Sequence, residues 1–423
     1  MRKPSAARRR GSAPRNDREC SRGKPTERDH WGPLMEISAI LAGIRIIDCT
    51  RNIAGPVATM LAAEMGADVI KVEPPGGDEM RQWPPFIDGQ SVYFVSCNRG
   101  KRSIAIDLKT SEGKSLLLRL LATADVLIEN YRPGTLEELG IGWSHVHDLH
   151  PRLVWVSVSG YGRSGPLARF PAYDSMMQAF TGIMGITGEK ERPPVRCGGS
   201  PIDIATAYLA WGSIMTGVHA VAKTGRGMLL EVSLMESALG FMHAYLQGAL
   251  VGLQLPIRMG TETLGMYPMG AFKTRNGEYC LVQVSNDIQW GRFCRTLGAE
   301  WLAADERFVS NPQRVKNRDA LRAILDERLR LRSAQEWEKL FGEAGVPVSH
   351  VRGLADVIAD EQVLARNMVK RTVLGSGKTI PTWGVPVKVN EDAESRLLHV
   401  PSLDQHREEI LLELQTLPAH AGS

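Results

Sequence analysis

Short apolar runs that alternate with helical patterns restrict the fold of this chain more than any other feature of its sequence. The apolar run 44–47 leads into a helical pattern that ends at Gly66, and a second apolar run follows at 69–72. A helix between two such strands connects parallel strands. The alternation continues in three later apolar runs, at 103–106, 126–128 and 153–158. The sequence therefore predicts an α/β fold built on a parallel sheet.

The length of the chain and a change of pattern after residue 255 predict two domains. The chain has 423 residues, of which 43% are hydrophobic, and Asn276-Gly277 between two apolar runs is a strong hairpin signal. Charge-rich helical patterns then run from 288 to 367. We expect five segments: a disordered basic extension over 1–35, a large parallel-sheet domain over 36–225, a linker strand and helix over 226–255, a small α+β domain over 256–370, and a C-terminal segment over 371–423.

The net charge of +4 comes from the first 35 residues, which hold 10 Lys and Arg against 4 Asp and Glu. The remaining residues carry 41 basic and 43 acidic side chains, a net charge of −2. We therefore expect no nucleic-acid partner. The sequence contains no unbroken apolar run of 18 residues, so we expect no membrane span. An arginine-rich transit peptide is one explanation of the basic segment, and a true start at Met35 is another.

Six cysteines are scattered along the chain without a C-x-x-C pair. This pattern fits a reducing compartment and argues against a zinc site. We therefore expect a cytoplasmic protein, or a mitochondrial one in a eukaryote, that has no metal site. Each cysteine is expected to be a small buried hydrophobe.

Two kinds of motif suggest ligand binding. A G-x-G-x-x-G sequence at 160–165 follows a predicted strand, but Pro166 prevents the helix that would bind a pyrophosphate, so NAD binding is disfavoured. The glycine-rich loop can still approach a ligand closely. Two basic clusters lie beside other predicted strands and fit either a solvated face or a phosphate site. One contains Arg99, Lys101, Arg102 and Lys109, and the other contains Arg132.

Asp203 stands at the start of a predicted apolar helix over 204–221, two residues after Pro201. Free backbone N–H groups at such a position stabilise a carboxylate. An ordinary N-cap aspartate has this local pattern. A catalytic carboxylate at a helix N-terminus has it too, so local spacing leaves both interpretations open.

Nine short segments run in order from residue 43 to residue 277. They are 43–50 (GIRIIDCT), 54–56 (AGP), 66–78 (GADVIKVEPPGGD), 101–109 (KRSIAIDLK), 125–134 (DVLIENYRPG), 159–162 (SGYG), 172–174 (AYD), 224–227 (TGRG) and 270–277 (GAFKTRNG). As a set they resemble the class III coenzyme A transferase family, the formyl-CoA transferase and carnitine-CoA transferase type of the CaiB/BaiF superfamily. This superfamily also contains the α-methylacyl-CoA racemases.

The resemblance implies a nucleophile at Asp203, about thirty residues after the A-Y-D segment. It also implies an interlocked, ring-like homodimer in which each chain has a large Rossmann-like domain and a small one, and in which the C-terminal segment 371–423 returns to the large domain. The family's CoA-binding segments match Ile106, Asp107, Leu108 and Lys109; Asn130, Tyr131 and Arg132; and Ala172, Tyr173 and Asp174. The basic clusters fall on these segments, which favours the phosphate interpretation. A loop with Gly260, Thr261 and Gly265 is expected to act as a lid.

We therefore expect an acyl-CoA:carboxylate CoA-transferase that moves coenzyme A from a donor such as succinyl-CoA to a small dicarboxylic acid, through an aspartyl-CoA thioester. CoA and acyl-CoA are then substrates, and no tightly bound cofactor is expected. N–H groups at the helix start are expected to bind the oxyanion, and Arg163 or Arg196 to pair a second carboxylate. Some oxalate-type relatives carry a glutamine where Ile53 stands, which disfavours oxalate or formate.

Three alternatives remain open. A 2-methylacyl-CoA racemase or epimerase is disfavoured because the racemases carry a histidine where Tyr173 stands, and a phenol exchanges protons poorly near neutral pH. A non-catalytic acyl-CoA-binding protein would form no covalent adduct at Asp203. A dinucleotide oxidoreductase would need the NAD affinity that the interrupted glycine motif disfavours.

Overall fold

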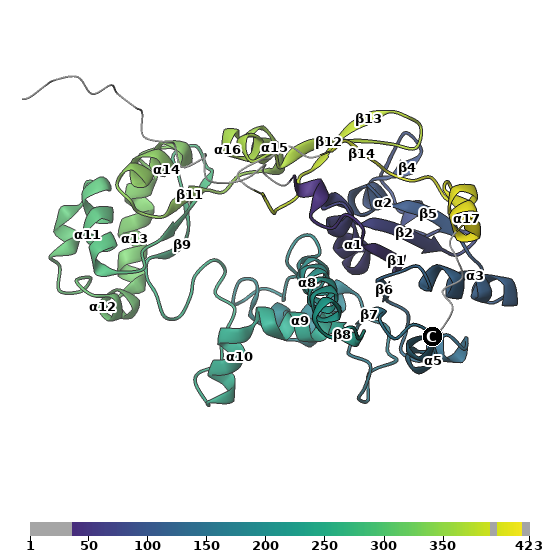
Figure 1. Ribbon diagram of the computed structural model, residues 1–423. Coiled ribbons are helices and arrows are strands. Elements are labelled where there is room, and N and C mark those ends of the chain that lie inside the picture. Colours follow the sequence, from purple (N-terminus) through teal and green to yellow (C-terminus); the bar gives the residue numbers. More distant parts are fainter. Residues whose placement is uncertain (1–35, 390–395, 417–423) are drawn as a thin grey trace, which may run out of the picture. The chain divides into compact units, whose positions relative to one another are not determined.

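A computed structural model describes residues 36–389 and 396–416, and the predicted extension over 1–35 lies outside the described residues. Six parallel strands form the main sheet in the order β5-β2-β1-β6-β7-β8 (Figure 1). Their bounds are Arg45–Cys49 (β1), Asp68–Glu73 (β2), Arg102–Ala105 (β5), Val126–Glu129 (β6), Val154–Ser159 (β7) and Leu229–Ser233 (β8). The predicted α/β fold with a parallel sheet is confirmed.

The central strands are buried on both faces, and for this reason they appear in the sequence as apolar runs, interrupted in β1 and β2 by the buried charged residues Asp48 and Lys71. In β1, Ile46 and Ile47 are both fully buried and point to opposite faces of the sheet. Helices α1 (Ala54–Glu64) and α8 (Pro201–Thr224) cover the face of Ile46. The face of Ile47 is covered by α3 (Ser111–Leu121), α5 (Trp143–Leu149) and α17 (Arg407–Thr416). The sheet is therefore the middle of three layers.

The main sheet extends beyond the predicted limit of the large domain at residue 225. Strand β8 follows α8 and pairs in parallel with β7, so the expected linker supplies the sixth strand. The single helix expected after it is two helices, α9 (Leu234–Phe241) and α10 (His243–Leu250), separated by Met242. Leu234 and Ala238 bury α9 in the core, whereas α10 buries none of its residues. The other predicted domain limits stay predictions.

A second, antiparallel sheet follows. Strands β9 (Met269–Lys273) and β10 (Tyr279–Gln283) form the hairpin predicted at Asn276-Gly277, and β11 (Val348–His350) pairs with β10. Phe293 and Phe341 stack in the core beside this sheet, with ring centroids 4.9 Å apart. The helices around it are α11 (Asp287–Thr296), η4 (Glu300–Ala303), α12 (Asn311–Lys316), α13 (Arg318–Leu329) and α14 (Ala334–Glu343). The short helices α15 (Leu354–Ala359) and α16 (Glu361–Ala365) follow β11 and bury none of their residues.

The C-terminal part of the chain contacts the main sheet again. Strand β12 (Val369–Val373) pairs with β13 (Thr379–Trp383) and β14 (Leu398–His399). Helix α17 then packs beside β5, where Arg102 lies 2.6 Å from Glu413 and Ile410 is buried among residues of the sheet. The short elements of the large domain are η2 (Ile37–Ala39), η3 (Glu79–Gln82), β3 (Phe86–Ile87), β4 (Gln90–Ser91), α2 (Val92–Asn98), α4 (Thr135–Glu138), α6 (Asp174–Phe180) and α7 (Ile183–Ile186).

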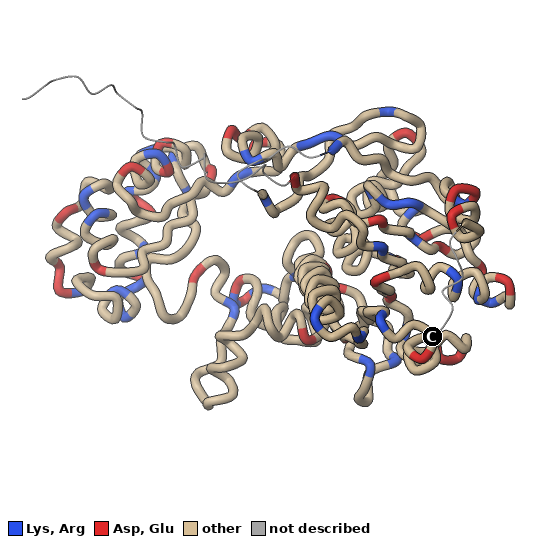
Figure 2. Tube along the Cα trace, viewed as in Figure 1, with Lys and Arg blue, Asp and Glu red and all other residues tan. Residues whose placement is uncertain are grey.

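Basic and acidic residues are interspersed along the described chain (Figure 2). Within its described residues, no group of three or more His, Cys, Asp or Glu side chains could hold a metal ion. One described helix, α8, is long and apolar enough to cross a membrane by length and composition alone. Ile202, Ala210 and Ile214 of this helix are fully buried in the core of the main sheet, and 28% of its most apolar 18-residue stretch is buried in all.

Candidate active site

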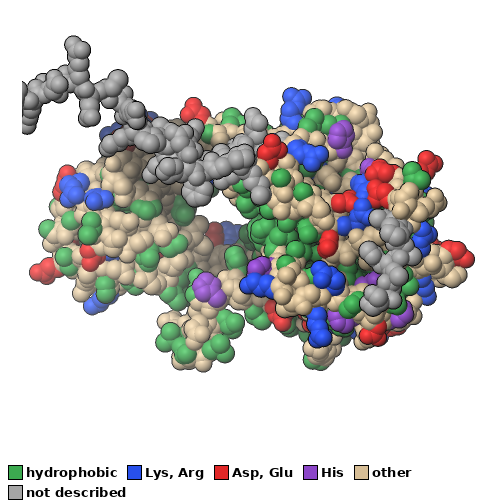
Figure 3. All heavy atoms as spheres, in the orientation of Figure 1, with side chains coloured by type: hydrophobic (Ala, Val, Ile, Leu, Met, Phe, Trp, Pro, Cys, Tyr) green, Lys and Arg blue, Asp and Glu red, His purple; other side chains and the backbone are tan. Residues whose placement is uncertain are grey.

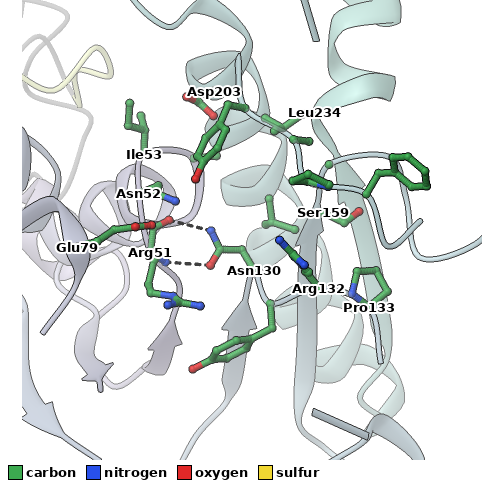
Figure 4. Close-up of a pocket in the computed structure, with 18 of the residues that line it drawn as sticks. Arg51, Asn52, Ile53, Glu79, Asn130, Arg132, Pro133, Ser159, Asp203 and Leu234 are labelled. Carbon is green, nitrogen blue, oxygen red and sulfur yellow. Dashed lines mark hydrogen bonds between the residues drawn. The ribbon is translucent and has the colours of Figure 1, made fainter. Parts of the chain in front are cut away.

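A cavity of about 280 Å³ opens at the carboxyl ends of β1, β6 and β7 (Figure 4). Open α/β sheets bind ligands at the carboxyl ends of their strands. Asp203 lines this cavity, which places the predicted nucleophile at the expected edge of the sheet. Loops after two strands and the end of a third supply much of the remaining lining: Arg51, Asn52 and Ile53 after β1, Asn130, Tyr131, Arg132 and Pro133 after β6, and Ser159 of β7.

Asp203 is the third residue of α8. Pro201 begins the helix, where its fixed φ suits the first turn. Ser200 holds the N-cap position and makes no side-chain hydrogen bond to the helix. The N-cap interpretation of Asp203 is therefore wrong. Its carboxylate forms no hydrogen bond or ion pair with another described residue, so it faces the cavity without a partner from residues 36–389 or 396–416.

The surroundings of Asp203 oppose its ionisation. Burial is the larger cause, and the nearby charge of Asp174 is the second. Together they raise the pKa of Asp203 from 3.8 to about 7. The group therefore exchanges its proton near neutral pH, and its ionised form is a stronger base and nucleophile than an ordinary aspartate.

The backbone donors at the start of α8 are already used. The N–H groups of Ile202 and Asp203 donate to Oδ2 of Asp174 at 2.7 and 3.2 Å. The expectation that these groups bind an oxyanion is wrong, because a carboxylate satisfies them. The start of α1 is a second helix N-terminus at the same cavity, lined by Ile53 and Ala54. The first N–H groups of a helix have no intrahelical acceptor, so α1 is the better source of oxyanion donors.

The residues of the A-Y-D segment lie in two different places. Ala172 and Tyr173 line the cavity, and the Tyr173 side chain is half exposed. Asp174 is 7% exposed and its carboxylate faces α8. The contact of Asp174 with CoA stays a prediction, and its side chain is bonded to the start of α8.

Asn130 fixes the loop that follows β1. Its Oδ1 accepts the N–H of Arg51 at 2.9 Å, and its Nδ2 donates to the Arg51 carbonyl at 2.8 Å (Figure 4). The Arg51 guanidinium lies over the ring of Tyr131, 5.4 Å from its centroid. The side chain of Arg132 is exposed and forms no ion pair within the described part of the chain. Among the described residues that line the cavity, Arg51 and Arg132 are thus the two cations available to phosphates.

The basic cluster around β5 has a structural role instead. The Arg99 guanidinium is fully buried and lies 2.5 Å from Glu64, and the buried Lys101 ammonium lies 2.9 Å from Asp48. Arg102 pairs with carboxylates of β2 and α17. The phosphate interpretation of these three cations is therefore wrong, because carboxylates on neighbouring elements already pair with them.

The segment that follows β5 lies apart from the cavity. Ile106, Asp107, Leu108 and Lys109 do not belong to its lining within the described chain. Oδ1 of Asp107 accepts the N–H of Lys109 at 3.0 Å, so this side chain shapes the turn before α3. Asp107 and Lys109 are not buried. The contact of this segment with CoA stays a prediction.

The expected lid residues Gly260, Thr261 and Gly265 also lie outside the lining of the cavity as far as the described residues show. Oγ1 of Thr261 accepts an N–H of β9 at 2.8 Å. The next residue, Glu262, pairs with Arg318 of α13 at 3.0 Å. The loop is therefore fixed to the small sheet and its helix in this conformation, and its action as a lid stays a prediction.

The two arginines considered for a second carboxylate differ in availability. Arg163 lies 2.7 Å from Glu137 and within 3.7 Å of Glu129 and Glu231, so three carboxylates of the chain already pair with it. Arg196 is exposed, and its Nη1 donates to carbonyls of the loop that leads into α8. Arg196 is the more available of the two, but it does not belong to the described lining of the cavity, so its pairing with a second carboxylate stays a prediction.

Comparison with known proteins identifies the family. The model of CoA-transferase family III matches residues 41–407. The chain belongs to CoA-transferase family III. It is 36% identical over 376 residues to the succinyl-CoA:glutarate CoA-transferase of Mus musculus, a match that covers 88% of this chain and 86% of the relative. It is also 36% identical over 368 residues to the acetyl-CoA:oxalate CoA-transferase of Acetobacter aceti, a match that covers 86% of this chain and 92% of the relative.

Solved structures agree with this assignment. The crystal structure of a CAIB/BAIF family protein from Brucella suis is similar to this chain with a TM-score of 0.79 at 35% sequence identity. The match covers 89% of this chain and 100% of that one. The resemblance inferred from the nine sequence segments is confirmed, and the chain is a class III CoA-transferase.

Sequence reasoning missed several residues that line the CoA-transferase cavity: Arg51, Glu79, Trp83 and Phe170. Arg51 had a usable signal, because it follows β1 as Arg132 follows β6, and both strand ends lie at the ligand-binding edge. Glu79 and Trp83 belong to the irregular segment between β2 and β5, where the sequence carries no comparable signal.

Proposed function

We propose that this class III CoA-transferase moves coenzyme A from a donor acyl-CoA, such as succinyl-CoA, to a small dicarboxylic acid. The observation that carries the proposal is Asp203, a carboxylate with a raised pKa that faces a cavity at the carboxyl ends of the sheet. The same cavity is lined by Arg51 and Arg132, which suit the phosphates of CoA. The names of two relatives support the acceptor class, because glutarate and oxalate are both dicarboxylates.

The first half of the proposed reaction loads CoA onto the enzyme. An oxygen of the Asp203 carboxylate attacks the thioester carbonyl of the donor, and the C–S bond breaks to release the CoA thiolate and leave a mixed anhydride. The thiolate then attacks the aspartyl carbonyl of this anhydride. The donor acid leaves as its carboxylate, and Asp203 carries CoA as a thioester.

The second half repeats these steps in the opposite direction. The acceptor carboxylate attacks the aspartyl thioester and expels the CoA thiolate, which forms a second anhydride. The thiolate attacks the acceptor carbonyl of the anhydride, and the bond to the Asp203 oxygen breaks. The products are the new acyl-CoA and the free Asp203 carboxylate, and no tightly bound cofactor takes part.

The chain's own groups support each step. With a pKa of about 7, a large fraction of Asp203 is ionised at neutral pH, which attack on the thioester requires. Each tetrahedral intermediate carries an oxyanion, and we assign its stabilisation to the backbone N–H groups at the start of α1. Arg196, on the loop before α8, is our candidate for the second carboxylate of the acceptor.

The decisive test measures transfer directly. The purified chain is incubated with succinyl-CoA and with glutarate, oxalate or acetate, and acyl-CoA products are followed by mass spectrometry. We expect a dicarboxyl-CoA product, its loss in Asp203→Ala, and CoA binding by this variant within about threefold of the unchanged chain, since Asp203 contacts the acyl carbonyl rather than the nucleotide. Asp148→Asn, an exposed aspartate of α5, is the matched control and should retain transfer.

Two outcomes would contradict the proposal. One is the absence of transfer with every donor and acceptor, together with α-deuterium incorporation into a 2-methylacyl-CoA in heavy water. That result would favour the racemase, although Tyr173 stands where a racemase needs its second proton carrier. The other is transfer that persists in Asp203→Ala.

We further propose that the working form is a homodimer. Exposed apolar side chains gather on α8, α9, α10 and the segment after them: Tyr208, Leu209, Phe241, Tyr245, Leu250, Val251, Leu253 and Leu255. Figure 3 shows hydrophobic side chains over α10. Apolar patches of this extent on a soluble protein mark interaction surfaces. Light scattering should give twice the chain mass, and Leu250→Asp with Leu253→Asp should reduce it; a monomeric unchanged chain at micromolar concentration would contradict the proposal.

A further inference from the structure

Helix α8 is capped by a residue from another helix. Its own N-cap residue, Ser200, makes no side-chain hydrogen bond. Asp174, the first residue of α6, supplies the missing acceptor from 28 residues earlier in the chain. One carboxylate oxygen, Oδ2, accepts both the N–H of Ile202 and the N–H of Asp203. The backbone of the proposed nucleophile is therefore bonded directly to a second carboxylate.

Gln178 fixes the orientation of this carboxylate. It lies one helical turn after Asp174 on α6 and is fully buried. Its Nε2 donates to Oδ1 of Asp174 at 2.5 Å, and its Oε1 accepts the N–H of Cys197 at 2.8 Å. Because the Cys197 bond requires an oxygen on one side, Gln178 must present its amide nitrogen to Asp174. The carboxylate thus has three N–H donors, and the loop before α8 is bonded to the same network.

The position of this carboxylate has a chemical consequence for Asp203. A negative charge held beside the nucleophile repels the ionised form of Asp203. That repulsion ends when Asp203 becomes an anhydride or a thioester, because both are uncharged. A fixed carboxylate at this place therefore favours the acylated enzyme over the free one.

We propose that Asp174 is a positioning residue for the transfer reaction, which holds the start of α8 in place and destabilises the free Asp203 carboxylate relative to its acylated forms. This inference rests on the proposed function. Gln178 serves the same role indirectly, by orienting Asp174.

The other charged groups near Asp203 do not replace Asp174 in this role. Arg51, Arg132 and Glu79 line the cavity on the substrate side. Of the elements packed against α8, α1 carries Glu64, which pairs with Arg99 and Lys370. Glu236 of α9 is bonded to Ser233, and Glu231 of β8 lies 3.6 Å from Arg163. After burial, the charge of Asp174 is the second cause of the raised pKa of Asp203.

The test separates the charge of Asp174 from its hydrogen bonds. In Asp174→Asn the oxygen can still accept from α8, but the new amide nitrogen faces the amide nitrogen of Gln178. The double variant Asp174→Asn with Gln178→Glu restores every donor and acceptor. In it, the amide nitrogen introduced at position 174 donates to the carboxylate introduced at position 178, whose second oxygen accepts from Cys197. This pair keeps one negative charge in the network but moves it away from Asp203.

We expect Asp174→Asn to lower kcat by about 10- to 100-fold, as misplaced catalytic groups do, with CoA affinity unchanged. The low-pH limb of kcat/KM should move down by about one pH unit because a like charge is removed. The fraction of enzyme trapped as an Asp203 adduct should fall. The double variant should recover most of kcat, but the low-pH limb of its kcat/KM profile should still lie at a lower pH than that of the unchanged chain. An unchanged limb and adduct fraction in a folded Asp174→Asn variant would overturn the proposal.

A second measurement is independent of turnover. Hydrogen exchange of the Ile202 and Asp203 amides should be about fivefold faster in Asp174→Ala, as expected for loss of a helix cap, and unchanged in Asp148→Asn. Unchanged exchange in Asp174→Ala would refute the capping role even if the transfer reaction is established. Faster exchange in a chain that transfers no CoA would reject the proposed function while the cap stands.

Discussion

Replacing the proposed nucleophile should stabilise the protein, by an amount that grows with pH. Burial and the charge of Asp174 raise the pKa of Asp203 from 3.8 to about 7. The native state therefore keeps this proton to a higher pH than the unfolded chain does. As pH rises between these two values, ionisation of Asp203 favours the unfolded state, and the native state loses stability. Asp203→Asn removes the titrating group and with it this loss.

The magnitude follows from the difference between the two pKa values. Each pKa unit corresponds to about 1.4 kcal/mol, so a difference of roughly three units costs about 4 kcal/mol above pH 7. At pH 5 the same relation gives a loss of about 2 kcal/mol. Asp203→Asn should therefore have a higher free energy of unfolding than the unchanged chain. This increase should be about 2 kcal/mol larger at pH 7.5 than at pH 5.

Urea unfolding, followed by tryptophan fluorescence and circular dichroism at both pH values, measures this difference. Asp148→Asn is the control, because substitution of this exposed aspartate should change stability by less than about 0.5 kcal/mol at either pH. A stability difference that stays constant or shrinks as pH rises would refute the reasoning, since it would mean that the fold does not oppose ionisation of Asp203.

Four further substitutions, one of them a control, test other parts of the structure. Lys101→Met leaves the buried Asp48 carboxylate without its ion-pair partner and should cost about 3 to 5 kcal/mol in urea unfolding, whereas Arg169→Ala at an exposed pair should cost under about 1 kcal/mol; equal effects would contradict the buried pairing. Arg132→Ala should raise KM for the acyl-CoA donor about tenfold with little change in kcat, and an unaltered KM would exclude Arg132 from the phosphate site. Arg196→Ala should raise KM about tenfold for dicarboxylate acceptors alone, and an equal rise for acetate would exclude its proposed role.

The main sheet could be predicted because its strands are buried on both faces. β6 and β7 therefore appear as largely apolar runs, β1 and β2 as apolar runs interrupted by Asp48 and Lys71, and the helices between them show their periodicity. The two-residue strands β3 and β4 and the interruption between α9 and α10 carry no such pattern, since packing rather than local composition determines them. The sixth strand, β8, is recognisable as a strand from its sequence, but its place in the sheet depends on pairing with β7.

The site was predictable where sequence motifs mark it and unpredictable where packing makes it. Asp203 could be found from its spacing to the A-Y-D segment, and Arg132 from its place after a strand. The role of Asp174 could not, because its bond to Ile202 joins residues 28 positions apart on two helices. The roles of Arg99 and Lys101 could not be predicted for the same reason, since their carboxylate partners lie 35 and 53 residues away in the sequence.

Chemical trapping at Asp203 tests the proposed covalent mechanism most directly. The chain is incubated with an acyl-CoA donor alone, quenched, treated with hydroxylamine or borohydride, and digested for peptide mass spectrometry, with Asp203→Asn as the control. We predict a hydroxamate, or the corresponding alcohol after borohydride, on the side chain of Asp203 and on no peptide of the control. Turnover of CoA between two acids without modification at Asp203, or with modification at another residue, would contradict this mechanism.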